Sequence, residues 1–461
     1  MSVLDRVFEL KARETTVARE VRGGITTFMA MAYIVLLNPI ILAGATDVTG
    51  ARLTIAQLTT ATALAAAVST LLMAFVGNAP FGLAAGLGLN AVVAYQAAPY
   101  MTWPQAMGLV VLEGVVIIVL AVTGLRTIIM NAIPLALKHA ISVGIGMFIA
   151  LIGLVDAGFV TRGTATPVQL GSTGHLTGWP VTLFSFGLLL MIVLYVRRLP
   201  GAILISIIVT AILAVIVDAV ARVDPRSWGV VRPRVPERLI APPDFGLVGQ
   251  VDVFGGFVRA GVLTASVVLF TLVLSGFFDA MGTIIGVADE AGLVDEQGRV
   301  PRLGRILTVD GVAGVIGGAT SSSANTVFVE SAAGVGDGAR TGLASVVTGA
   351  LMGLTLLFTP LAGVVPAAAA APALVLVGAL MMTQSRNVPW DDLEMAIPAF
   401  LTIALMPFTY SITNGVGAGV VSYTLIKAAR GKFTEIPWLL WVVSAIFLAY
   451  YAIDALEGWA T

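Results

Sequence analysis

Acidic side chains within apolar segments are the residues of this chain best suited to chemistry. Glu330 follows the run ATSSSANTVFV (319–329), and Asp279 lies within VLFTLVLSGFFDAMGTIIG (268–286). An unpaired Asp at the centre of a membrane-spanning helix costs roughly 2.5 to 3.5 kcal/mol on insertion scales. A carboxyl group with apolar neighbours favours its neutral form, so it can take up and release a proton. Two such groups in one cavity would suit proton coupling; pairing with a nearby Arg, or capping of a helix, is the alternative interpretation.

Two segments rich in small residues carry polar groups that could bind a ligand. In APFGLAAGLGLNAVVAYQ (79–96), three glycines precede Asn90, and in 319–336 a serine run with Asn325 and Thr326 precedes Glu330. Glycine lets the backbone extend or approach a ligand closely, and non-helical backbone at membrane depth is tolerated where it is buried in protein or lines a cavity. We therefore expect two facing elements, each an extended stretch followed by a half-helix, that form a hydrogen-bonding cradle. Close helix packing is the alternative explanation of the glycines.

Further polar residues within apolar segments are predicted to support this site. Glu113 and Asp310 could orient it, but structural pairing is the favoured interpretation of both residues. The first apolar segment is partly polar, with Thr26, Thr27, Tyr33 and Asn38. Asn38 precedes Pro39, which indicates a kink as readily as a ligand contact.

Aromatic side chains stand next to the two acids. Phe277 and Phe278 precede Asp279 directly, and Phe328 lies two residues before Glu330. Aromatic faces close to carboxyl and amide groups suit a flat, heterocyclic ligand with ring N–H donors. Ordinary packing, or contact with lipid, is the alternative.

The elements that must position these residues are membrane helices. Of the 461 residues, 58% are hydrophobic and 11% are charged, and the mean hydropathy is +0.99; a soluble domain has about 25% charged residues. The net charge of −1 gives no sign of a nucleic-acid partner. With no Cys and two His, the chain cannot form disulfides or a metal site built on those residues, and we expect no cofactor.

Apolar segments of about 20 residues predict an all-α integral membrane protein with fourteen or fifteen crossings, the first near 24–43. Arg197, Arg198, Arg302 and Arg305, together with the basic N-terminus, place the N-terminus in the cytoplasm. The segment 437–454 is either an extra crossing or a helix lying on the surface. The expected divisions are 1–23 (cytoplasmic N-terminus), 24–220 (first repeat, spans 1–7), 221–256 (extracytoplasmic linker), 257–430 (second repeat, spans 8–14) and 431–461 (C-terminal segment).

The two halves are weakly alike. Each contains a long span, a Pro-containing link and another span, preceded by one of the two segments rich in small residues. With seven spans in each half, the second copy starts on the opposite side of the membrane, which gives an inverted repeat, a common plan for secondary transporters. Chance similarity between apolar segments is the alternative.

Several stretches resemble the AzgA-like purine permeases of the nucleobase–cation symporter superfamily, in a match that runs from about residue 8 to 430. They are TTVAREVRGGITTFMAMAYIVLLNPIIL (15–42), AAGLGLNAVVAYQ (84–96), FFDAMGTIIGVADEAGLVDEQGRVPRLGRILTVDGV (277–312) and VFVESAAGVGDGARTGLASVVTGAL (327–351). Together these motifs are specific to the family. The resemblance implies fourteen helices in two inverted repeats of seven, a core domain of helices 1–4 and 8–11, a gate domain of the rest, and half-helices at the third and tenth spans.

The resemblance also implies a ligand site between the third and tenth helix breaks and the eighth helix, at Asn90, Glu330 and the region of Asp279. Members of the family usually carry Asp-x-x-Asp in the eighth helix, whereas this chain has Gly276 at the first position. Ala85 stands where the family often has Pro. The purine site then relies on Glu330 alone, or the ligand is a different small polar molecule.

The sequence therefore predicts a proton-coupled importer of purine nucleobases (adenine, guanine or hypoxanthine) in the cell membrane, working by alternating access. Glu330 would bind the ring N–H groups and respond to protonation, Asn90 would bind the base edge, and Asp279 would be a second titrating group. Many members of the family form homodimers. An anion exchanger or uncoupled channel on the same plan is the alternative within transport, and an intramembrane enzyme is the alternative outside it; we expect neither, because the site is acidic and the chain has no HExxH motif and no paired His.

Overall fold

The computed structural model describes residues 3–124, 133–163, 166–236, 238–293, 300 and 302–452. The first half of the chain forms α1 (Val3–Phe8), α2 (Val17–Met31), α3 (Ile34–Gly44), α4 (Ile55–Leu72), η1 (Met73–Gly77), β1 (Leu83–Ala85), α5 (Leu87–Val92), η2 (Val93–Ala97), α6 (Trp103–Thr123), α8 (Leu135–Asp156), β2 (Val160–Thr161), β3 (Gln169–Leu170), α9 (Trp179–Val196), α10 (Ala202–Ala221) and η3 (Pro225–Trp228).

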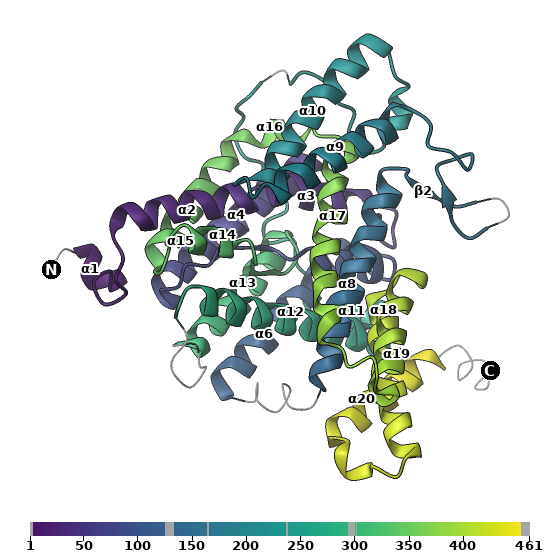
Figure 1. Ribbon diagram of the computed structural model, residues 1–461. Helices are drawn as coiled ribbons and strands as arrows, with labels where there is room; N and C mark the ends of the chain where they lie inside the picture. The colour runs from purple at the N-terminus through teal and green to yellow at the C-terminus, as the bar shows by residue number, and fades with distance from the viewer. Residues whose placement is uncertain are drawn as a thin grey trace.

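The second half forms α11 (Gly255–Arg259), α12 (Val262–Glu290), α13 (Leu303–Thr320), β4 (Asn325–Val327), α14 (Ser331–Gly336), α15 (Gly342–Leu354), η4 (Thr355–Phe358), α16 (Thr359–Ala362), α17 (Ala367–Met381), η5 (Met382–Asn387), α18 (Leu393–Phe408), α19 (Ile412–Ala429), η6 (Phe433–Glu435) and α20 (Trp438–Tyr451). Helices from the two halves interleave in space, so that α2 and α4 lie beside α15 (Figure 1).

Within the described residues, nine helices are long and apolar enough to cross a membrane. A chain with this many apolar helices is a multi-pass membrane protein, as the composition predicts. The first span begins earlier than expected, at Val17 rather than near Gly24, because the Thr16 side chain caps the helix by accepting a hydrogen bond from the backbone N–H of Arg19. Arg19 and Arg22 therefore lie inside α2 and not before it.

The first span is broken at Ala32 and Tyr33, between α2 and α3. Pro39 lies inside α3, so the break falls one and a half turns before the Asn38–Pro39 pair that indicated a kink. Asn38 is buried and donates to the Thr62 hydroxyl (2.8 Å) and to the backbone oxygen of Ser322 (3.0 Å). These two bonds tie the first span to its neighbours, while the Oδ1 atom of Asn38 is buried and has no hydrogen-bond partner among the described residues.

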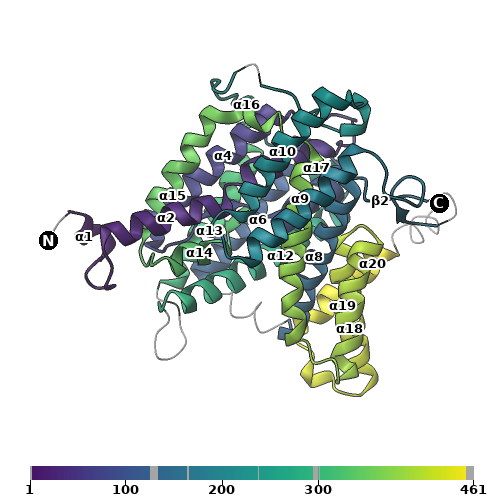
Figure 2. The ribbon, with the colours of Figure 1, turned by 45° about the horizontal axis from the view of Figure 1, so that its top comes forward.

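The helices fall into two packed groups. The first, which we call the strand group, comprises α2–α6, α12–α15 and the strands β1 and β4, and its tightest crossing is that of α6 with α13. A Cβ atom on Gly114 would lie 2.5 Å from the backbone oxygen of Gly311, so only glycine permits this approach. The second, the flanking group, comprises α8–α10 and α17–α19, with α8 packed against α17. Within the strand group, the long helix α12 lies on the side next to the flanking group, where it contacts α8 and α19 (Figures 1 and 2).

The helices α9 and α10 at the edge of the flanking group expose apolar side chains. Val196 is 74% exposed and Val220 is 80% exposed. In water such a face would be costly, but it suits contact with lipid. The two helices therefore form part of the surface that faces the bilayer.

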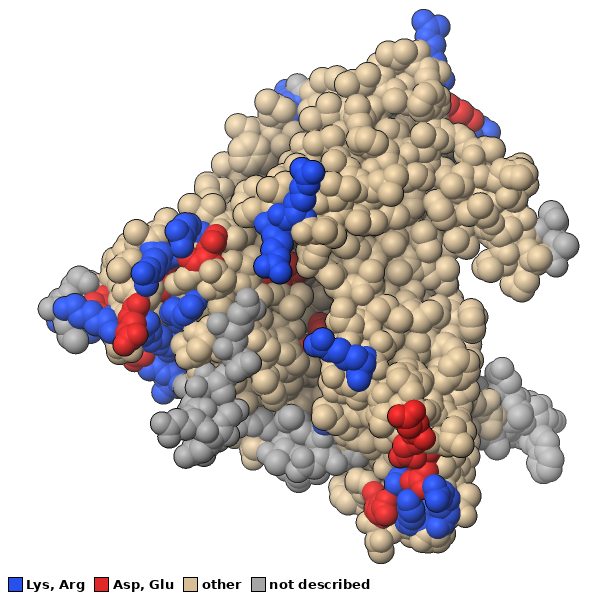
Figure 3. Space-filling model, viewed as in Figure 1, with Lys and Arg blue, Asp and Glu red and all other residues tan. Residues whose placement is uncertain are grey.

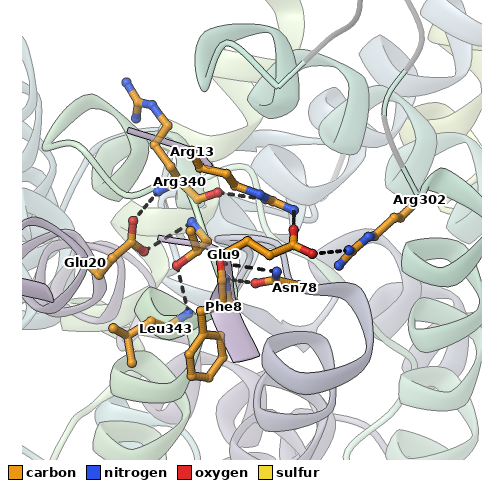
Figure 4. Close-up of polar contacts among 10 residues, drawn as sticks. Phe8, Glu9, Arg13, Glu20, Asn78, Arg302, Arg340 and Leu343 are labelled. Atoms are coloured by element: carbon orange, nitrogen blue, oxygen red, sulfur yellow. Dashed lines mark hydrogen bonds and ion pairs between the residues drawn. The ribbon is translucent and has the colours of Figure 1, made fainter. Parts of the chain in front are cut away.

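The N-terminal segment is tied to the strand group by polar contacts (Figure 4). Glu20 is fully buried and accepts from the Thr15 hydroxyl (2.8 Å) and from the backbone N–H groups of Arg340 (2.9 Å), Thr341 (3.2 Å) and Ala344 (3.3 Å). Its carboxylate therefore satisfies N–H groups at the start of α15 that would otherwise lack partners. An ion pair between Glu9 and Arg302 (2.6 Å) adds a contact to the start of α13.

The C-terminal helix α20 runs antiparallel along α19. Ser444 donates to the Thr424 hydroxyl (2.9 Å) near the end of α19, while the Tyr451 hydroxyl donates to the backbone oxygen of Asn414 near its start (2.9 Å). With 14 residues, α20 is not among the nine candidate spans, so both interpretations of 437–454 stay predictions. Residues 453–461 lie outside the described part of the chain.

Candidate functional site

Two short strands, distant in sequence, pair at the centre of the strand group. β1 and β4 run antiparallel, with Leu83 opposite Val327, Ala84 opposite Thr326 and Ala85 opposite Asn325. Each strand leads into a short helix, β1 into α5 and β4 into α14. The extended stretches and half-helices expected from the glycine-rich and serine-rich segments are therefore present in the structure.

Buried polar side chains hold these strands in place. Asp310 of α13 accepts from the Thr326 hydroxyl and from the backbone N–H of Val327, both at 3.0 Å. The Thr70 hydroxyl of α4 bonds both backbone groups of Leu83, at 2.9 and 3.1 Å. Asp310 thus has a structural role, which was one of the two interpretations of this residue.

Glu330 is the N-cap residue of α14, follows the end of β4 after two intervening residues, and is half-buried. Its Oε1 atom accepts a hydrogen bond of 2.6 Å from the hydroxyl of Tyr33, which is fully buried at the α2–α3 break. This partner, 297 residues away in sequence, was not predicted; the polarity of the first span was the one signal of it. The bond holds the carboxyl group beside the paired strands β1 and β4.

Asp279 lies on α12 and is exposed, and we call the open stretch of surface beside it the crevice. Further along α12, Gly282 and Gly286 have open space where side chains would be, and Val329 beside Glu330 is 58% exposed. Figure 3 shows acidic atoms in a hollow of this face, between two basic stretches on an otherwise largely uncharged surface. Across the crevice, the Lys138 ammonium group of α8 lies 5.0 Å from the centre of the Phe278 ring. Phe278, the residue before Asp279, therefore carries a cation of the flanking group over its ring.

Asn90 on α5 is fully buried, and neither atom of its amide has a hydrogen-bond partner among the described residues. A buried polar group without a partner costs about 1 to 3 kcal/mol, so a site of this kind calls for an explanation. A ligand that offers both a donor and an acceptor would satisfy this amide.

The structure gives the neighbouring aromatic and strand residues different environments. Phe277 and Phe328 are buried in apolar clusters, at 1% and 6% exposure. Their environment agrees with ordinary packing. Phe278 is half-buried and contacts Phe277 with 5.6 Å between ring centres. Ala85 and Asn325 are opposite one another within the strand pair and are buried.

Gly276 is buried against a carboxyl group of another helix. The Oε1 atom of Glu113 on α6 lies 2.5 Å from the position that a Cβ atom on Gly276 would take. Its Oε2 atom is buried and has no hydrogen-bond partner among the described residues. An acidic group therefore fills the space where the resemblance led us to expect an acidic side chain on α12.

Thr27 of α2 packs against Gly334 of α14, close to Glu330. A separate cavity of about 910 Å³ lies between the N-terminal segment and the starts of α13 and α15, away from the paired strands β1 and β4. Several Arg side chains line this cavity. The described residues hold no cluster of three or more His, Cys, Asp or Glu side chains that could bind a metal ion.

Comparison with known proteins identifies the family. Residues 18–417 match the permease family. The chain belongs to this family. The permease is 37% identical to the guanine/hypoxanthine permease PbuO of Bacillus subtilis, over 96% of this chain and 98% of PbuO, and 37% identical to the adenine permease AdeP of Escherichia coli strain K12, over 97% and 95%. It is also 38% identical to a putative permease of Methanocaldococcus jannaschii, over 97% and 98%. The expected resemblance is confirmed, and the permease belongs to a family of transporters and not of enzymes.

Solved structures share the fold of the permease. The transmembrane domain of a cyanobacterial bicarbonate transporter, BicA, aligns with a TM-score of 0.57 at 16% identity, over 90% of this chain and 97% of that domain. The murine anion transporter Slc26a9 in its inward-facing state aligns with a TM-score of 0.60 at 14% identity, over 90% and 68%. At this level of identity, the likeness concerns the fold alone.

Proposed function

We propose that this permease imports purine nucleobases together with protons across the cell membrane, by alternating access. The observation that carries the proposal is the position of Glu330. Tyr33 holds its carboxyl group beside the paired strands β1 and β4 and the crevice. The relatives PbuO, a guanine/hypoxanthine permease, and AdeP, an adenine permease, support purines as the substrate class.

The chemistry of the site suits a purine base. Ring N–H groups are donors, and an ionised carboxylate is an acceptor that makes hydrogen bonds of about 1.5 to 3 kcal/mol net. One oxygen of Glu330 accepts from Tyr33, and the other is assigned to the ligand. The amide of Asn90 offers a donor and an acceptor without protein partners among the described residues, which matches the mixed edge of a purine. Phe278 supplies an aromatic face at the crevice.

Proton coupling is assigned to Glu330 and Asp279. Both are carboxyl groups within membrane-embedded segments, where ionisable residues mark substrate or proton pathways. Asp279 is exposed to the crevice, so a proton can reach it. Protonation would change both the charge and the hydrogen-bonding capacity of the site, which links ligand binding to the proton gradient.

The packing supports a 7+7 inverted repeat and hence alternating access. If spans 1–7 (24–220) correspond to spans 8–14 (257–430), α4 corresponds to α13, α6 to α15 and α8 to α17. The crossing of α4 with α15 is then the counterpart of that of α13 with α6, and α9 with α10 that of α18 with α19; all four pairs are packed together. We infer that the strand group is a core domain and the flanking group a gate domain. The segment 221–256 would link the repeats on the outside, and the N-terminus would be cytoplasmic. A homodimer stays a prediction.

Two alternatives are weighed against specific observations. The fold is shared with anion transporters, but a site with Glu330 and Asp279 repels anions. Gly276 favours the second alternative, transport of another small polar solute, because α12 offers no acid at that position.

Uptake of radiolabelled hypoxanthine, guanine and adenine into cells that lack their own purine permeases tests the substrate class. We expect accumulation of at least one chemically unchanged base, reduced by an excess of the unlabelled base. Thr210→Val is a control variant that should leave uptake unchanged, because Thr210 lies in α10 of the flanking group and its buried hydroxyl has no hydrogen-bond partner among the described residues. If none of the three bases accumulates while the protein is present in the membrane, the purine assignment is wrong.

A further inference from the structure

Glu113 of α6 is a buried carboxyl group for which the fold makes dedicated room. It is 2% exposed. Its Oε1 atom lies 2.5 Å from where a Cβ on Gly276 would be, and its Oε2 atom lies 2.8 Å from where a Cβ on Gly314 would be. Glycines on two different helices, α12 and α13, therefore leave the niche that this side chain occupies.

Stability does not account for the acid in this niche. The Oε2 atom has no hydrogen-bond partner among the described residues, and a buried acceptor left unpaired costs about 1 to 3 kcal/mol. An apolar side chain of similar volume would avoid this cost. Buried, unpaired ionisable groups of this kind cluster at functional sites.

The niche adjoins the proposed ligand site. Gly276 is one helical turn before Asp279 on α12, and residues three apart on a helix are neighbours on its surface. Leu89, which precedes Asn90 on α5, lies 3.5 Å from the same Cβ position on Gly276. Among the described residues, Asp310 of α13 is the titratable group that interacts electrostatically with Glu113, and Asp310 interacts with Asp279 as well. The niche is thus one turn of helix from a carboxyl group exposed to the crevice.

We propose that Glu113 supplies, from α6, the carboxyl group that α12 lacks at Gly276, and that it binds and releases a proton during the transport cycle. The proton reaches it through the part of the crevice beside Asp279 and leaves by the same route after the core domain has moved. This inference rests on the proposed function, since it names a further residue for the same coupling.

The test exchanges the carboxyl group between the two helices. Glu113→Gln keeps the shape and removes the titrating group, and we expect gradient-driven purine uptake to fall by more than about tenfold and its pH profile to change, while exchange of labelled for unlabelled base without a gradient persists. Glu113→Ala with Gly276→Asp removes the acid from α6 and rebuilds it on α12 with the same number of side-chain atoms, and we expect this double variant to recover gradient-driven uptake. Glu113→Ala with Gly276→Asn is the matched control, which fills the niche without a carboxyl group and is expected to stay uncoupled.

The outcomes separate this inference from the proposed function. If the wild-type protein accumulates purine and Glu113→Gln does so with an unchanged pH profile, the inference is overturned and the proposed function stands. Equal recovery by the Asp and Asn double variants also overturns it, because volume alone would then explain the niche. A wild-type protein that takes up no purine instead overturns the proposed function, whatever the variants do. Melting temperatures of the purified variants check the shared niche independently: Gly276→Asp alone should destabilise, since its side chain meets Glu113, and adding Glu113→Ala should relieve this.

Discussion

Replacing Glu330 by Gln tests the role of the carboxyl group that lies beside the paired strands β1 and β4. In the wild-type protein, Oε1 accepts a hydrogen bond of 2.6 Å from the hydroxyl of Tyr33, which leaves the other oxygen for a ligand N–H. Gln has one acceptor in place of two. If its oxygen keeps the bond to Tyr33, its NH₂ group faces the ligand donor; if its oxygen turns to the ligand, the bond from Tyr33 is lost.

Either orientation costs one hydrogen bond to a charged group, which is worth about 1.5 to 3 kcal/mol. Since 1.4 kcal/mol is a factor of ten, kcat/KM for purine uptake should fall by about 10- to 150-fold. The assay is the initial rate of radiolabelled purine uptake over a range of concentrations, normalised to the amount of protein in the membrane.

Tyr33→Phe supplies the control. With the hydroxyl gone, the Gln oxygen of the double variant is free to face the ligand, so Glu330→Gln with Tyr33→Phe should be no worse than Glu330→Gln alone. This non-additivity is expected of residues in direct contact. A Glu330→Gln variant that transports within about threefold of the wild-type rate, or a double variant whose losses simply add, refutes the reasoning.

Three further predictions concern residues that shape the fold. Asp310→Ala should abolish uptake and lower the melting temperature, since it leaves the Val327 N–H unpaired at a cost of about 1 to 3 kcal/mol. Asp310→Asn keeps the accepting oxygen and should retain uptake and the wild-type melting temperature. Equal loss in the two variants contradicts a structural role. Glu20→Ala should lower the melting temperature by several degrees while Glu9→Ala, at a more exposed ion pair, changes it little; the reverse order contradicts the capping of α15. Burial raises the pKa of Asp47, in the loop between α3 and α4, but hydrogen bonds from Thr49 and from backbone N–H groups outweigh it and hold this pKa below the ordinary value of 3.8, so the stabilisation is present above pH 3.8 and is lost as the pH falls below it. Melting temperatures measured between pH 5 and pH 3, a range of about one unit on either side of the unfolded value, should fall less steeply for Asp47→Asn than for the wild type, and parallel curves contradict this prediction.

The local features of the site could be predicted from sequence. The glycines before Asn90 and the serine run before Glu330 indicated extended backbone followed by half-helices, and β1, α5, β4 and α14 are where those signals lie. The low share of charged residues and the long apolar segments indicated membrane helices. These signals, like the glycine and serine runs, lie in consecutive residues and can be read from the sequence.

Contacts between distant segments could not be predicted. The bond from Tyr33 to Glu330 and the approach of Glu113 to Gly276 both depend on how whole helices cross. The start of α2 at Val17 depends on a cap by Thr16, a polar signal that hydropathy overlooks. The aromatic residues show the same limit: nothing in their spacing separates buried Phe277 and Phe328 from Phe278 at the crevice.

Uptake into proteoliposomes is the direct test of proton-coupled purine import by this permease. Purified protein is reconstituted into vesicles, and labelled hypoxanthine, guanine or adenine is supplied outside with and without an inward proton gradient. We expect a purine to accumulate above its outside concentration only under the gradient, and this accumulation to collapse when a protonophore is added. Entry of the base at the same rate and to the same level with and without the gradient would contradict it.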